Sequence, residues 1–325
     1  MGEVHEAGFR PAWWLPGPHL QTLWPLLRPR PRLALRRERV ELDDGDFIDL
    51  EIGPGGGPSV VVIHGLEGGL DSHYAATTLV ALATAGFRPI FMYLRGCSGE
   101  PNRLARAYHS GASDDLAAVL AHLAGSPDGP ALAAVGFSLG GNLLLKYLGE
   151  TAEPRLEAAV AVSVPFVLRD AMLRLNIGGS KIYREHLMRR LKETYRRKQS
   201  VMPDLVDPGL DGMTDFFDFD DRITAPLNGF AGADDYYARC SCRAFLRDIH
   251  TPTLILHALD DPFMFKRTVP AADELGPGVR LELARCGGHV GFVGGALPWR
   301  PAYWMEARLV AFLREIGGAA PKSVD

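Results

Sequence analysis

The sequence has few cysteines, no long apolar run and little net charge. Its 325 residues include four cysteines, Cys97, Cys240, Cys242 and Cys286, without the spacing of a disulfide framework. We therefore expect reduced thiols. No apolar run reaches the roughly 18 residues of a membrane span, and residues 1–10 lack the regions of a secretory signal. A net charge of −4 argues against nucleic-acid binding. These absences predict a soluble, cytoplasmic protein.

Metal and dinucleotide sites are also missing from the pattern. His64, His73, His109, His257 and His289 fall in separate segments without ligand spacing. The glycine-rich run 53–57 precedes an expected strand, whereas a dinucleotide fingerprint follows one. We expect no cofactor and no metal.

Short apolar runs recur along the chain, most of them separated by segments long enough for helices. This pattern is typical of a mostly parallel sheet with helices on both faces, the α/β class. Arg39–Ile52 instead alternates around Asp44-Gly45, which predicts a hairpin at an antiparallel edge. The expected parallel strands are Ser59–Ile63, Arg88–Leu94, Ala131–Val135, Leu156–Val162, Thr253–Ala258 and Val279–Leu283.

The strand pattern stops between residues 165 and 247. A basic helical stretch, Ile182–Lys198, is followed by an acidic one, Asp204–Asp221. An insertion at the carboxyl side of a parallel sheet lies where ligand crevices form, so we interpret it as a helical cap. The predicted organisation is a core of residues 39–164 and 248–318, a cap of 165–247, and a flexible tail of 319–325.

Residues 1–38 are expected to form an arm and a linker. Three of the five tryptophans, Trp13, Trp14 and Trp24, lie here among prolines that forbid a long helix or a central strand. The arm is expected to lay its aromatic side chains on the core. A contact with a lipid surface or with an acyl pocket is the alternative, because tryptophan suits a half-wet interface.

The segment Gly136-Phe137-Ser138-Leu139-Gly140 has the G-x-S-x-G pattern, between an apolar run and a helix-periodic run. This pattern holds a serine on a sharp turn from strand to helix, where its oxygen is exposed at the end of the sheet. Small flanking residues are needed because the turn crowds neighbouring Cβ atoms. Ser138 is the candidate nucleophile.

A serine hydroxyl needs a base to take its proton, and the base needs a carboxylate to fix its tautomer. On this type of sheet the acid follows a late strand and the histidine follows the last one. Asp260 and Asp261 come directly after Thr253–Ala258, and His289 follows Val279–Leu283 between glycines. We assign His289 as the base and favour Asp260 as the acid, with Asp261 as the alternative that supports the loop.

The anion formed during such a reaction needs hydrogen-bond donors. The backbone N–H of Leu139, at the start of the helix, is one candidate, and the backbone N–H of Leu66, in the loop after Ser59–Ile63, is the other. His64 is expected to hold that loop through its backbone. Asn142, Arg95 and His109 are interpreted as structural.

Motifs along nearly the whole chain resemble the YheT-like α/β-hydrolases, which are related to abhydrolase-domain lipases. The resemblance rests on residues 19–25, 64–68, 95–97, 136–142, 236–237, 257–263 and 287–292, in the order of the family. It implies an α/β-hydrolase fold and a carboxylic ester hydrolase that uses Ser138, Asp260 and His289. Short or medium acyl chains are the implied substrates. An acyltransferase or a phospholipase-type lipase is the alternative, and a non-catalytic scaffold is disfavoured by the complete set of residues.

Overall fold

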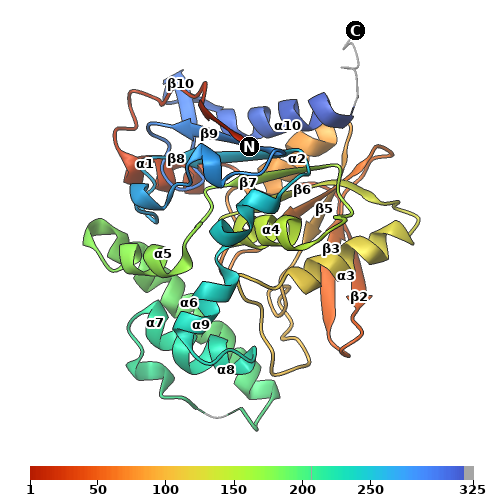
Figure 1. Cartoon of the computed structure of the whole chain (residues 1–325), viewed down its shortest axis with the longest axis vertical. Coiled ribbons are helices and arrows are strands. Elements are labelled where there is room, and N and C mark those ends of the chain that lie inside the picture. The colour runs from red at the N-terminus through yellow and green to blue at the C-terminus, as the bar shows by residue number, and fades with distance from the viewer. Residues whose placement is uncertain (206, 318–325) are drawn as a thin grey trace.

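Nine strands form one twisted sheet in a computed structural model that describes residues 1–205 and 207–317 (Figure 1). Their order is β1-β9-β8-β7-β6-β4-β5-β3-β2. Strands β4 to β9 and β1 run parallel to one another, whereas β3 runs antiparallel to β5 and to β2. The bounds are β1 Glu3–Glu6, β2 Arg36–Glu41, β3 Phe47–Ile52, β4 Ser59–Ile63, β5 Arg88–Met92, β6 Ala131–Phe137, β7 Ala158–Val162, β8 Thr253–Ala258 and β9 Val279–Ala284.

Helices cover both faces of this sheet (Figure 1). α2, Ala75–Thr84, and α10, Trp304–Gly317, pack with Val60 and Val62 of β4 on one face. α3, Ser113–Ala124, and α4, Leu139–Glu150, pack with Val61 and Ile63 on the other. Successive side chains of a strand point to opposite faces, so a strand buried on both sides must be apolar throughout. The expected α/β sheet and its parallel strands are confirmed.

The segment between β7 and β8 is helical and forms a separate layer beyond the ends of the strands (Figure 1). It has a hydrophobic cluster of its own that includes Leu175, Tyr183, Leu191 and Phe216. Its elements are α5 Leu168–Leu175, η2 Gly178–Ser180, α6 Lys181–Val201, η3 Leu210–Gly212, α7 Phe216–Phe219, the π-helical turn η4 Asp220–Thr224, α8 Ala225–Leu227, α9 Ala233–Cys240 and η5 Cys242–Asp248.

Three parts of the fold depart from the sequence prediction. The first residues of the expected arm form β1, which extends the sheet beside β9. A second small sheet pairs β10, Val293–Leu297, with β11, Arg300–Tyr303. The region expected to be a linker enters β2 at Arg36. The predicted tail, residues 319–325, lies outside the described residues.

The rest of the N-terminal segment packs along β10 and β11. It contains α1, Pro18–Leu23, and the 3-10 helix η1, Trp24–Leu27. The rings of Trp14 and Trp24 are 4.9 Å apart, and the Trp14 indole N–H donates to the Gly295 carbonyl. Trp13 donates to the Ala296 carbonyl, yet 76% of its surface is exposed. Two of the three tryptophans are thus partly buried, while Trp13 faces solvent.

Three buried histidines make the fold sensitive to acid. Burial lowers the pKa of His64 and His257 to about 4 and that of His109 to about 3, from an ordinary 6.5. The unfolded chain binds these protons near pH 6.5 and the folded chain does not, so stability is lost as pH falls from about 6.5 to about 4. Each histidine is worth about 3 kcal/mol over that range. Together they rival a typical unfolding free energy of about 5–15 kcal/mol.

We therefore expect the protein to unfold in mild acid, as followed by circular dichroism across a pH series. The His257→Asn variant should unfold at lower pH than the wild type, because one proton acceptor of the unfolded state is gone. His250→Asn, at an exposed position, is the matched control and should leave the midpoint unchanged. Asp220, whose pKa burial raises to about 6, acts in the opposite direction and cannot outweigh three histidines. Equal unfolding free energies at pH 7 and pH 4.5 would contradict the prediction.

Candidate active site

Ser138 lies on a strained turn at the end of β6. Its backbone angles, φ 51° and ψ −116°, are unusual for a residue with a side chain. α4 begins immediately after it and packs so closely that a Cβ on Gly140 would lie 2.5 Å from the His64 carbonyl oxygen. A Cβ on Gly136 would lie 2.4 Å from the Gly140 carbonyl oxygen. A side chain at either position would clash with the backbone, so only glycine fits there. This close packing of β6, α4 and the His64 loop holds Ser138 in its strained conformation.

Ser138, His289 and Asp261 form a chain of hydrogen-bonding groups. The Ser138 Oγ lies 3.1 Å from His289 Nε2, and His289 Nδ1 lies 2.8 Å from Asp261 Oδ2. Each of the three follows a different strand: Ser138 follows β6, Asp261 follows β8 and His289 follows β9. The Asp261 side chain is buried, with 1% of its surface exposed. A buried carboxylate against one imidazole nitrogen favours the tautomer whose other nitrogen can accept a proton from the serine.

The expectation that Asp260 contacts His289 is wrong. Asp260 accepts a hydrogen bond from the Gly288 N–H at 3.0 Å and so ties its own loop to the histidine loop. The Asp261 N–H donates to the Ala258 carbonyl, which closes a turn straight after β8. This turn carries Asp260 to the partly exposed side and directs Asp261 to the imidazole. Each aspartate therefore occupies the position expected of the other.

Several groups that the sequence analysis missed position the histidine. The Phe263 ring stacks on the imidazole, with centroids 3.9 Å apart and 4° between the planes. The His289 backbone N–H donates to Thr22 Oγ1 of α1, and the Val290 N–H donates to Ser163 Oγ. Thr22 lies in the motif of residues 19–25, and that motif was the only feature of the sequence that could have pointed to it. Nothing in the sequence places Ser163 in the site, because the contact spans 127 residues.

The loop after β4 approaches Ser138 from the other side. A Cβ on Gly65 would lie 3.2 Å from the Ser138 Cβ, so the two backbones nearly touch. His64 is neutral and buried, donates to the Gly65 carbonyl through Nδ1 and accepts from the Leu94 N–H through Nε2, as expected of a residue that holds the loop. Leu66 and Leu139 both line the pocket that contains Ser138. Their predicted function as anion donors remains a prediction.

Glu67 joins this loop to the helical insertion. Its φ of 51° lies in the left-handed region, which is costly for a non-glycine residue. Its backbone N–H donates to the Tyr108 hydroxyl, and its carboxylate accepts from Tyr108 at 2.7 Å and from Thr194 of α6 at 2.6 Å. The insertion therefore holds the residue next to Leu66 in place.

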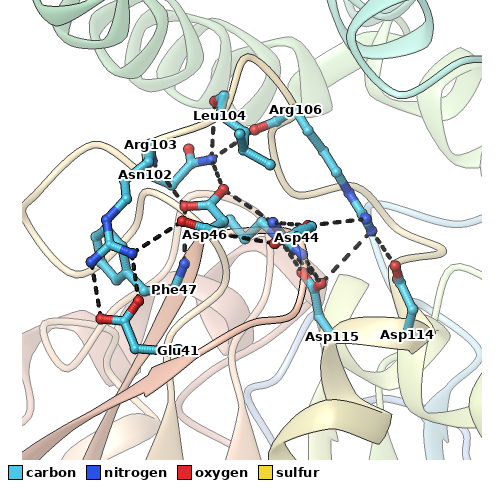
Figure 2. Close-up of polar contacts among 12 residues, drawn as sticks. Glu41, Asp44, Asp46, Phe47, Asn102, Arg103, Leu104, Arg106, Asp114 and Asp115 are labelled. Atoms are coloured by element: carbon cyan, nitrogen blue, oxygen red, sulfur yellow. Dashed lines mark hydrogen bonds and ion pairs between the residues drawn. The ribbon is translucent and has the colours of Figure 1, made fainter.

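A buried ionic network fixes the loop of residues 99–110, which forms one wall of the pocket. The guanidinium of Arg95 pairs with Asp115 and Asp46. Figure 2 shows Asp46 facing Asn102 and Arg103 of this loop; Asp46 accepts hydrogen bonds from both. Arg95 is thus structural, as expected. His109, in the same loop, lines the pocket and accepts from the Gly111 N–H.

Two further residues connect this wall to the rest of the molecule. Lys198 of α6 donates to Asn102 and to the Arg106 carbonyl, both at 2.7 Å, and burial lowers its pKa to about 8. Asn142 of α4 donates to the Ser110 and Cys240 carbonyls and accepts from the Cys242 N–H. The structural interpretation of Asn142 is confirmed.

A pocket extends from Ser138 beneath the insertion. It holds about 1230 Å³ of empty space, which includes its opening to solvent. Its walls are mostly apolar, with Asp220, Tyr237 and Thr224 as a polar group; the Asp220 carboxylate accepts from both hydroxyls. Within the described residues no cluster of three or more His, Cys, Asp or Glu side chains could hold a metal. The apolar lining includes Leu168, Met172, Leu175, Leu187, Leu191, Phe216, Phe219, Ile223, Phe263 and Met264.

Comparison with known proteins places this geometry in a family. A family pattern described as alpha/beta hydrolase fold matches residues 58–296. The Escherichia coli (strain K12) protein YheT, whose name describes it as a candidate esterase, is 41% identical over 305 residues, covering 91% of this chain and 89% of YheT. The mouse protein Phospholipase ABHD3 is 28% identical over 319 residues, covering 92% of this chain and 76% of its own.

A solved structure agrees on the fold. The Pyrococcus furiosus esterase Pf2001 superposes with a TM-score of 0.57 at 14% identity, covering 88% of this chain and 94% of that one. The parallel sheet, the turn at Ser138 and the matched relatives all indicate the same fold. The chain belongs to the alpha/beta hydrolase fold family and is similar over nearly its whole length to YheT.

Proposed function

We propose that the protein is a serine hydrolase that cleaves carboxylic esters of short or medium acyl chains. The observation that carries the proposal is the unbroken hydrogen-bonded chain from Ser138 through His289 to Asp261. A serine, a histidine and a buried carboxylate in this order perform acyl transfer on unrelated folds, because the chemistry needs this geometry and no particular scaffold.

In the first half of the reaction, the Ser138 oxygen attacks the ester carbonyl while His289 takes its proton. Asp261, buried at the other imidazole nitrogen, stabilises the positive charge that the histidine gains. The carbonyl oxygen becomes an anion in the space between the Leu66 loop and the start of α4. The backbone N–H groups of Leu66 and Leu139 are its proposed donors, and the loss of one such donor typically raises the barrier by about 3–4 kcal/mol.

In the second half, His289 returns the proton to the leaving alcohol, and the acyl group stays on Ser138. Water then enters, gives its proton to His289 and attacks the acyl carbonyl. Collapse of that second intermediate releases the acid and restores the serine hydroxyl. The proton that leaves Ser138, and the one that His289 returns to it at the end, cross the 3.1 Å contact between Ser138 Oγ and His289 Nε2. The other two transfers pass between the same Nε2 and the alcohol or the water.

The pocket supports an acyl substrate. Apolar walls of leucine, methionine and phenylalanine suit a hydrocarbon chain, which gains about 0.8 kcal/mol for each buried CH₂ group. The helical insertion, residues 165–247, supplies much of this lining and acts as a cap over the site. Relatives whose names denote ester-cleaving enzymes, Phospholipase ABHD3 of mouse and Monoacylglycerol lipase of Saccharomyces cerevisiae, agree with this substrate class.

Covalent labelling tests the proposal directly. A fluorophosphonate should add to the wild-type protein at one site, seen by intact mass, because it reacts with an activated serine. The Ser138→Ala variant should not be labelled. Ser59→Ala is a matched control and should stay labelled, since this buried serine begins β4, at the opposite end of that strand from the Leu66 loop, and donates to the Asp128 carbonyl. A folded wild-type protein that stays unlabelled, or a labelled Ser138→Ala variant, would refute an activated Ser138.

A further inference from the structure

Large apolar side chains lie exposed together on the N-terminal segment and the β10–β11 hairpin. Single exposed apolar residues are ordinary, but a group of them marks an interaction surface. Trp13, Leu27 and Trp299 are 76%, 75% and 75% exposed. We call this group the apolar face, and it comprises Trp13, Leu20, Leu23, Leu26, Leu27, Leu297 and Trp299.

The N-terminal segment, which carries five of these residues, is tied to the hairpin that carries the other two. The indole N–H of Trp13 donates to the Ala296 carbonyl of β10, one residue before Leu297. The Arg28 guanidinium, directly after Leu27, lies 3.5 Å from the centroid of the Tyr303 ring in β11. α1 and β10 occupy the same edge of the molecule, at the upper left of Figure 1. The segment and the hairpin therefore form one surface.

The N-terminal segment that carries most of the apolar face has charged residues of one sign. Between Glu6 and Glu38 the sequence has no acidic residue and six arginines. Arg28 is neutralised by Glu306, but Arg10, Arg30, Arg32 and Arg300 are exposed and form no ion pair within residues 1–205 and 207–317. Exposed tryptophan and leucine flanked by free arginines match the chemistry of an anionic bilayer surface. Such a surface accepts apolar side chains at its interface and attracts cations to its headgroups.

This edge also borders the candidate active site. α1 exposes Leu20 and Leu23, while Thr22 of the same helix accepts from the His289 N–H. His19 of α1 lies 3.0 Å from the Tyr183 hydroxyl of the insertion. A surface that rests on α1 is thus one helix away from the histidine. Within the described residues no helix is long and apolar enough to cross a bilayer, so contact would be peripheral.

From these observations we propose that the apolar face docks the protein on anionic lipid membranes. The arginines bring the protein to the headgroups, and Trp13, Leu27 and Trp299 enter the interface. Docking does not depend on ester cleavage, so failure of one proposal leaves the other standing.

Vesicle sedimentation tests the proposal, with the full chain carrying Ser138→Ala so that no lipid can be cleaved. Binding is expected to vesicles of phosphatidylcholine with phosphatidylglycerol and to be weaker to phosphatidylcholine alone. The triple variant Trp13→Ser, Leu27→Ser, Trp299→Ser should bind about tenfold more weakly or worse. Deleting the whole segment is a poorer test, because it would also remove β1 and Thr22.

Matched controls separate docking from damage to the fold. Val201→Ser with Phe217→Ser removes two exposed apolar side chains of the insertion and should bind as the parent does. A second triple variant should lose the preference for anionic vesicles. It carries Arg30→Gln, Arg32→Gln and Arg300→Gln. Each variant must keep the parent's thermal unfolding midpoint. A parent that ignores anionic vesicles at low salt, or an apolar-face variant that binds unchanged, would overturn the proposal. So would a dimer in solution that the triple variant dissociates, because the face would then be a contact between two copies.

Discussion

Replacing His289 by alanine is expected to lower kcat for a p-nitrophenyl acyl ester by about a million-fold. The serine hydroxyl loses the base that takes its proton, and the leaving alcohol loses its acid. Because the proposed mechanism uses Ser138, His289 and Asp261 as a unit, Ser138→Ala and the double variant should be about as slow as His289→Ala, not slower by a further million-fold. Initial rates of the purified variants, with KM measured alongside, check this.

The control for His289→Ala is a histidine that is equally buried in this fold but placed outside the chain of contacts. His257, buried in β8 and absent from the pocket lining, is such a residue, and His257→Asn should retain most of the activity per folded molecule at pH 7. The His289 variant itself should stay folded, because its backbone contact to Thr22 does not involve the imidazole. A His289→Ala protein with near wild-type turnover would show that another group activates the serine.

Asp261→Asn is expected to lower kcat by about ten-thousand-fold, with little change in KM. An amide in this place can present its NH₂ group to Nδ1, which stabilises the wrong tautomer and leaves the imidazolium without a counter-charge. Asp260→Asn is the paired variant, since it changes the adjacent residue by the same atoms. Its carboxylate accepts from the Gly288 backbone, and an amide oxygen can still accept that bond.

The two variants give opposite results under the two assignments of the acid. If Asp261 is the acid, Asp260→Asn should cost tenfold or less, about 1.4 kcal/mol at most in the barrier. If the large loss follows Asp260 instead, the observed contact between Asp261 and His289 does not carry the reaction. Phosphonate labelling rates provide a second readout, because they depend on activation of the serine and not on deacylation.

The sequence predicted the sheet well because its strands are buried on both faces. Val60, Val61, Val62 and Ile63 have no exposed surface, and such runs have few alternatives to a central strand. The positions of Ser138 and His289 followed from glycines that the backbone contacts require. These features are local in the sequence, so they can be recognised without knowledge of the rest of the fold.

The sequence prediction was wrong where contacts between distant parts of the chain determine the structure. β1 is a four-residue strand whose side chains are all exposed, so no buried face marks it; its pairing with β9 holds it in the sheet. β10 contains Gly294 and Gly295, which favour a loop by propensity. The choice between Asp260 and Asp261 depended on a turn closed by one backbone hydrogen bond, from the Asp261 N–H to the Ala258 carbonyl. Neither residue type nor spacing encodes that bond.

The pairing of β1 with β9 has a consequence for biosynthesis. Glu3 pairs with Arg280, and Thr22 meets His289 across 267 positions of sequence. The N-terminal segment therefore has no partner until β9 and the histidine loop have been translated. Contacts between such distant segments pay a large loop-closure entropy and form slowly. We expect a nascent chain to form the central strands of the sheet while β1 and Thr22 still lack their partners, so that the site is assembled only after the histidine loop has been translated.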